Sequence, residues 1–177
     1  MSDLKHYSLP LKGLKDGMHE FDFEVDSHFF QDFEASPIRE GEFSVQLYFD
    51  KRPDLIVLTF QLEGTFQATC DRCLNEVMLP IRDSHQLMVK YSEQQTEEAE
   101  VVYIPRGSTE LNVAKFIYEY ICLSMPIVKT CDSPGESPAC DSKMLQYLGS
   151  EETDSEEAED QDEGNPIWDA LKNFKKN

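Results

Sequence analysis

The sequence has no long apolar run. No uninterrupted apolar stretch approaches the roughly 20 residues that a membrane-spanning helix needs. The first residues also lack a basic segment followed by an apolar one, the pattern that marks a secretory signal. We therefore expect a cytoplasmic protein.

Basic residues are scarce as well. Lys and Arg number 16 against 35 Asp and Glu, which gives a formal net charge of -19. Such a chain lacks the cations with which proteins bind nucleic acid broadly through its phosphates, so an RNA contact would have to be local. A local patch would need residues such as Arg72, Arg82, Lys90 and Arg106. The charge itself favours basic proteins as partners.

Familiar catalytic motifs are also missing. The chain has no glycine-rich phosphate loop, no Gly-x-Ser-x-Gly elbow and no paired histidines for a catalytic metal. His85 falls on the apolar side of an alternating segment, where it could be a ligand or a base, although a lone histidine there is more often a core residue. We expect a protein that is not an enzyme.

The most distinctive residues are four of the five cysteines. Cys70 and Cys73 are separated by two residues, and both can face one point only if the chain turns between them. A second pair, Cys131 and Cys140, is separated by eight residues, unlike a metal knuckle. Cys122 lies on a helical apolar stripe and is predicted to be core.

Three interpretations of the four cysteines remain open. They can form a structural tetrathiolate zinc site that fastens the later loop to the first turn. They can be incidental, with Cys70 continuing an apolar face and the others lying in loops. A redox pair at Cys70 and Cys73 is favoured less, because the pair stands between two strand patterns and not at a helix start.

Alternating apolar residues predict strands over 42–49, 56–68, 77–91 and 101–104, with the two longest forming a hairpin whose tip is 70–75. Gly64 is expected to mark a bulge or bend. Helical spacing follows over 111–125, with Pro126 as its terminator. The fold class is therefore α+β: an antiparallel, partly barrel-like sheet with a long hairpin, one main packed helix, an irregular cysteine-containing loop and a tethered C-terminal helix.

Composition divides the chain into three parts. Residues 1–149 are predicted to form a single α+β domain, and 150–164 an acidic disordered linker. Residues 165–177 are predicted to form a short amphipathic helix that binds through Trp168, Leu171 and Phe174. So short a helix needs a surface, on its own domain or on a partner.

Several of these segments occur in the order typical of a known family. A Leu-Pro-Leu segment is followed by a hairpin with Cys-Asp-Arg-Cys-Leu at its tip, an acidic loop, a helix ending in Leu-Ser-Met-Pro, two more cysteines and a final Asn-Pro-x-x-x-x-Leu-x-x-Phe. In this order the chain resembles the YceD-like family, the large ribosomal RNA subunit accumulation proteins. Many relatives carry closely spaced cysteines after the helix, whereas this chain has only Cys131 and Cys140 there.

The resemblance implies a small cytoplasmic protein that supports synthesis, processing or stability of large-subunit ribosomal RNA and is not an enzyme. It supplies no mechanism. The charge suggests one: an acidic adaptor that holds a basic large-subunit ribosomal protein or assembly factor, with rRNA contacted indirectly or locally. The alternative from a different class is a small structural-zinc or redox-sensing binding protein without a ribosomal role.

Overall fold

The computed structural model describes residues 4–92, 101–133 and 139–149. Chain contacts divide the protein into two units, Met1–Asp141 and Ser142–Asn177. The elements of the first unit, in order, are the 3-10 helix η1 (Leu4–Tyr7), β1 (Ser8–Pro10), β2 (Gly17–Val25), α1 (Ser27–Gln31), β3 (Gly41–Lys51), β4 (Leu55–Thr69), β5 (Glu76–Tyr91), β6 (Val101–Ile104), β7 (Glu110–Asn112) and α2 (Ala114–Leu123). The second unit contains α3 (Ser142–Gly149).

The main sheet has five strands in the order β2-β3-β4-β5-β6. The first three pairings are antiparallel, and β6 joins β5 in parallel. β1 and β7 form a separate antiparallel pair. The α+β prediction is confirmed, and among the described residues the sheet is open at β2 and β6, so it does not close into a barrel.

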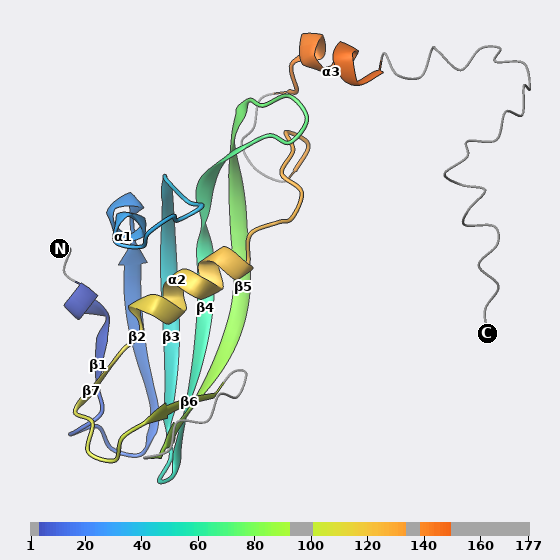
Figure 1. Ribbon diagram of the computed structural model, residues 1–177. Helices are drawn as coiled ribbons and strands as arrows, with labels where there is room; N and C mark the ends of the chain where they lie inside the picture. Colours follow the sequence, from blue (N-terminus) through green and yellow to red (C-terminus); the bar gives the residue numbers. More distant parts are fainter. Residues whose placement is uncertain (1–3, 93–100, 134–138, 150–177) are drawn as a thin grey trace, which may run out of the picture. The chain divides into compact units, whose positions relative to one another are not determined.

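The longest feature is the β4–β5 hairpin (Figure 1). Its register runs without interruption from Leu55 opposite Lys90 to Thr69 opposite Glu76. The predicted hairpin with its tip at 70–75 is therefore confirmed. Because successive side chains alternate across a strand, this register also fixes which residues face the core.

One face of the sheet carries the core. Its inward positions on β3 and β4 are fully buried, among them Val45, Leu47 and Leu58. Helix α2 crosses this face (Figure 1) and inserts Ile117 and Ile121 against it. The side-chain carbonyl of Asn112 accepts a hydrogen bond from the Ala114 amide at 3.0 Å, at the helix start. The predicted main helix is thus observed with a buried stripe, but it spans Ala114–Leu123 and not 111–125, because Leu111 and Asn112 belong to β7.

Aromatic rings join the two helices to each other and to the sheet. Phe33 of the loop after α1 stacks on Tyr118 of α2 with ring centres 4.0 Å apart. Tyr120 of α2 lies 5.2 Å from Phe60 of β4. These contacts explain the cluster of phenylalanines after residue 28, which belongs to the core.

The bulge expected at Gly64 is not present. Gly64 pairs directly with Phe43 on one side and Ile81 on the other, within a continuous register. The glycine instead leaves room for Phe43: a Cβ atom at this position would meet the Phe43 ring and backbone and the Glu42 carbonyl oxygen. The small residue serves close packing inside a strand of continuous register.

Among the described residues, no helix is both long and apolar enough to cross a membrane. The predicted linker 150–164 and the predicted helix 165–177, with Trp168, Leu171 and Phe174, lie outside the described residues. The predicted domain boundary at 149 stays a prediction. α3 belongs to the second unit and exposes Tyr147 and Leu148.

We predict that Gly64→Ala destabilises the protein by about 1–3 kcal/mol, because the new methyl group would be forced against the backbone and ring of Phe43. Urea unfolding, monitored by far-ultraviolet circular dichroism, measures the change in the free energy of unfolding. Thr65→Ala, one residue further on the exposed face, is the matched control and should change stability by less than about 0.5 kcal/mol. Equal unfolding midpoints for Gly64→Ala and the parent protein would contradict the packing argument.

Candidate metal centre

The turn between β4 and β5 brings two cysteines to one side of the hairpin tip. The Cys70 amide donates to the Asn75 carbonyl at 2.8 Å, and the Leu74 amide donates to the Cys70 carbonyl at 3.0 Å. Leu74 adopts a left-handed conformation with φ of 63°. Non-glycine residues take this conformation at a cost, so the tight turn is maintained by its surroundings. The result is that Cys70 and Cys73 are both buried at the tip.

The chain that follows α2 returns to this tip. The Asp71 amide donates to the Lys129 carbonyl at 2.7 Å, and the Lys129 amide donates to the Asp71 carboxylate at 2.7 Å. Arg72 forms an ion pair with Asp132 at 2.6 Å. The two residues between the first cysteines therefore hold the segment that carries Cys131.

All four cysteines predicted as metal ligands meet at this point. Their sulfur atoms lie within 4.8 Å of one another. The Cys73 and Cys131 sulfurs are 3.5 Å apart, and those of Cys70 and Cys140 are 3.9 Å apart. The sulfurs are too far apart for disulfides, and the cysteines are free.

These separations fit a tetrahedral metal site. A zinc–sulfur bond of about 2.3 Å places the corners of a regular tetrahedron about 3.8 Å apart. Both measured pairs lie close to that value. Among the described residues the cluster consists of four cysteine sulfurs, a donor set of the kind that holds zinc in closed structural sites. The cluster is therefore compatible with zinc.

Hydrogen bonds prepare one of the thiols for ligation. Backbone N–H groups lower the pKa of Cys70 to about 6; the amide of Cys73 contributes most, those of Arg72 and Cys131 add to it, and burial opposes it. Burial raises the pKa of Cys131, and the neighbouring Cys73 thiol raises it further. Ligation of a cation by all four cysteines requires their thiols to lose protons.

Cys122 takes no part in the cluster. It lies half-buried on α2, where burial raises the pKa of its thiol. The cysteine that the sequence assigned to the helix stripe is therefore separate from the four at the hairpin tip.

His85 lies elsewhere, where β5 passes under the end of α2. Its Nε2 atom is 2.8 Å from the Ser124 hydroxyl and 3.2 Å from the Asp83 carboxylate, and its ring stacks on Tyr120 with centres 4.6 Å apart. A catalytic relay needs the carboxylate on one ring nitrogen and the nucleophile on the other. Here both approach the same nitrogen, so the group fastens the last turn of α2 to the sheet.

One comparison with known proteins, a scan of protein families, gave a match. The family model described as "Large ribosomal RNA subunit accumulation protein YceD" matches residues 58–175. The chain belongs to the YceD family. The matched region begins in β4 and includes all four clustered cysteines. The family's name describes an accumulation factor for large-subunit ribosomal RNA and not an enzyme.

Two further comparisons gave no match. Neither the curated proteins nor the solved structures contain one that matches this chain.

The structure also tests the residues suggested for a local RNA patch. Arg72 is at the hairpin tip, Arg82 is in the middle of β5, and Lys90 is near its other end. Arg82 is held by both carboxylate oxygens of Glu63, at 2.7 and 2.8 Å. These three residues are spread along the hairpin and do not form one patch with Arg106.

Sequence reasoning missed the role of Asp71 at the tip. We predict that Asp71→Ala speeds hydrogen exchange at the Lys129 amide roughly fivefold, because one charge-assisted hydrogen bond worth about 1 kcal/mol is lost. Exchange measured by nuclear magnetic resonance reports this directly.

Arg72→Ala is the matched control. Its ion pair with Asp132 is solvent-exposed and contributes little, so exchange at Lys129 should change less than about twofold. If both variants had the same effect, the hydrogen bond from Lys129 to Asp71 would not be what holds the loop.

Proposed function

We propose that the protein acts in the cytoplasm as a non-enzymatic factor that supports accumulation, processing or stability of large-subunit ribosomal RNA. It does so as an acidic adaptor for a basic ribosomal protein or assembly factor. The ribosomal part of the proposal is supported by membership of the YceD family. The adaptor part is supported by the outer face of the main sheet.

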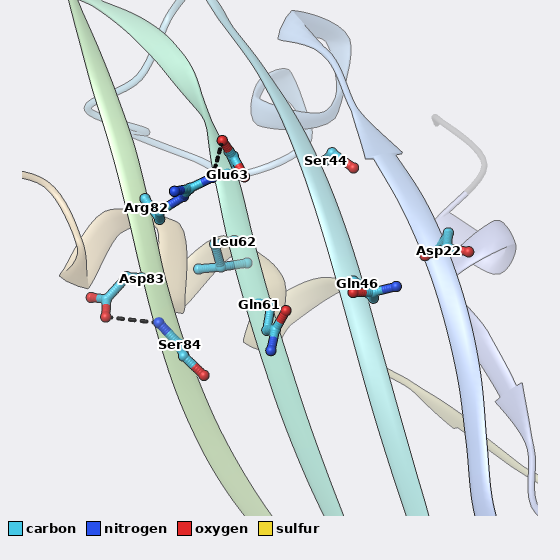
Figure 2. A pocket seen from close by; sticks show the side chains of 9 residues that line it. All are labelled: Asp22, Ser44, Gln46, Gln61, Leu62, Glu63, Arg82, Asp83 and Ser84. Carbon is cyan, nitrogen blue, oxygen red and sulfur yellow. Dashed lines mark hydrogen bonds and ion pairs between the residues drawn. The ribbon is translucent and has the colours of Figure 1, made fainter.

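The outer face of the sheet is hollowed and polar (Figure 2). A depression of about 640 Å³ extends across β2, β3, β4 and β5. Its polar lining follows the strand register in rows: one row contains Asp22, Gln46, Gln61 and Ser84, and the next contains Ser44, Glu63 and Arg82. Glu24 pairs with Ser44 in the second row and extends it beyond the lining of the depression. Since every second residue of a strand points to this side, the rows form a continuous surface.

Negative charge gathers at the β2 side of this surface. Glu20, Asp22, Glu24 and Glu42 are exposed there, and we call them the acidic face. None of the four forms an ion pair with another described residue. The one arginine lining the depression, Arg82, is already paired with Glu63. The acidic face therefore keeps its charge available for a basic partner.

We predict that the triple variant Glu20→Gln, Asp22→Asn, Glu24→Gln recovers basic large-subunit proteins about tenfold less well in pull-downs. Three exposed charge contacts of about 0.5 kcal/mol each account for that factor. The parent interaction should weaken as salt rises, and the variant should show less of this dependence.

The control is Glu34→Gln, Glu40→Gln, Glu110→Gln, which removes the same charge from exposed positions elsewhere. Each protein is also expressed in a deletion strain, and ribosomal subunits are separated by sedimentation. The control should restore large subunits and the acidic-face variant should leave a shortage. Recovery of free rRNA alone, or full restoration by the acidic-face variant, would overturn the adaptor proposal. The carboxylates could instead only keep the β2 edge from pairing with the edge strand of another molecule. In that case the acidic-face variant will self-associate and still bind the basic partner, which would also contradict the adaptor proposal.

The four cysteines support a second element of the proposal: one structural zinc held by Cys70, Cys73, Cys131 and Cys140. The support is the match of two of their sulfur separations to a tetrahedron and the meeting of four thiol sulfurs within 4.8 Å of one another. When bound, zinc would supply a fixed crosslink between the hairpin tip and the loop after α2. The role is structural, because four protein ligands leave no open position.

We predict about one zinc per chain in protein purified without a metal-binding tag. Cys131→Ser should abolish it and lower the melting temperature, because three ligands and an open position bind less tightly. Elemental analysis and thermal unfolding measure these effects. Cys122→Ser is the matched control and should keep the metal. Metal-free parent protein with an unchanged melting temperature after chelation would show that the cysteines are packed thiols only.

A further inference from the structure

A second pocket lies at the end of the sheet opposite the cysteines. Three connections meet there: the β1–β2 connection, the β3–β4 turn and the β6–β7 loop (Figure 1). The two ends are separated by the length of β4, whose 15 residues extend about 50 Å. The pocket is therefore distinct from the metal centre and from the depression on the outer face.

The pocket concentrates cations in a chain that has few. Its volume is about 310 Å³, and Lys12, Lys51, Arg52 and Arg106 line it. Asp16 is the one carboxylate among the described lining residues. Over the whole chain, acidic residues outnumber basic ones by 35 to 16. Among the described residues lining this pocket, the reversed ratio favours the binding of an anion.

Lys51 connects segments that line the pocket through hydrogen bonds. Its ammonium group donates to the Leu11 carbonyl at 3.0 Å and to the Leu14 carbonyl at 2.8 Å. The Leu11 amide in turn donates to the Thr109 carbonyl at 2.9 Å. One lysine thus links the three connections, and an ammonium group with three donors has one left for a ligand.

Two other cations are free to bind. Lys12 and Arg106 are exposed, and neither pairs with a described carboxylate. Arg106 projects from a tight turn in which the Ser108 amide donates to the Pro105 carbonyl at 3.1 Å and Gly107 has φ of 113°. That conformation favours glycine, so the turn holds Arg106 in place.

Arg52 is oriented beside them. Its Nε and Nη2 atoms donate to the Asp50 carboxylate at 2.9 and 2.7 Å, which leaves Nη1 unengaged. Arginine and lysine donors that converge in this way suit the tetrahedral oxygens of a phosphate. Tyr91 also lines the pocket and is of the side-chain type on which nucleic-acid bases stack.

The acidic character of the chain does not prevent such binding. Glu20, the nearest member of the acidic face along β2, is four residues beyond Asp16, or about 13 Å of extended strand. At physiological salt, exposed charges are screened beyond about 8 Å. Within the described lining of the pocket, four cations outnumber the single carboxylate of Asp16, which favours a small anionic group there.

We propose that this pocket binds a phosphate group, carried by an RNA backbone or free in solution, through Lys12, Arg52 and Arg106. Lys51 positions the pocket. The site does not depend on the acidic face, so the protein can contact an anionic and a basic partner at separate places.

The test compares Lys12→Ala, Arg106→Ala with the parent protein. A labelled short single-stranded RNA of mixed sequence is the probe, and fluorescence anisotropy is measured at several salt concentrations. The variant should bind roughly tenfold more weakly at low salt, and its dependence of log affinity on log salt should be shallower by about 0.7, because the contact with one phosphate is lost. Inorganic phosphate alone is titrated in a second arm.

Two further proteins keep the test decisive. Arg39→Ala, Lys115→Ala removes the same charge from other exposed positions and should bind like the parent. Lys12→Arg, Arg106→Lys keeps the charges and should retain most of the affinity. Loss in the RNA arm alone assigns the phosphate to a nucleic-acid backbone, and loss in the phosphate arm assigns it to a free anion. Equal losses in the pocket and control variants, or no loss in either arm, would overturn the proposal.

Discussion

The β4–β5 hairpin is the constraint on which the rest of the molecule depends. Its two strands pair in one uninterrupted register. β3 pairs with β4, and β2 pairs with β3, in registers that are equally continuous. A shift by a single residue would exchange the two faces of the strand and expose the core. The same register delivers Cys70 to the tip, aligns polar rows on the outer face and places Lys51 at the opposite end.

The hairpin tip holds the segment that follows α2 through hydrogen bonds. Residues 127–140 contain prolines and a glycine and belong to no regular element in the described part. Hydrogen bonds between Asp71 and Lys129 bring the segment to the tip. The convergence of four sulfurs adds a second means of attachment. A backbone clamp that arranges ligands in advance reduces the entropy lost on closing the site.

The charges of the protein are segregated by the same architecture. Carboxylates gather on the outer face at β2, whereas lysines and arginines from three connections gather at one end of the sheet. Net charge alone describes neither surface, because screening confines each to its neighbourhood. His85, the residue with the geometry closest to a catalytic one, is engaged by Ser124 and Asp83 through a single nitrogen and serves packing.

The sequence by itself determined the strands β3 to β6, their inner and outer faces, the hairpin with its tip at 70–75, the main helix and the family, because alternation, helical spacing and the Cys-Asp-Arg-Cys motif are patterns visible in the sequence. Only the tertiary structure decided the rest. The close packing of Phe43 on Gly64, the parallel pairing of β6, the approach of Cys140 despite its spacing, and the meeting of Lys12, Lys51 and Arg106 all join residues distant in the chain. Such contacts depend on how elements pack, and no local pattern encodes the distance between them.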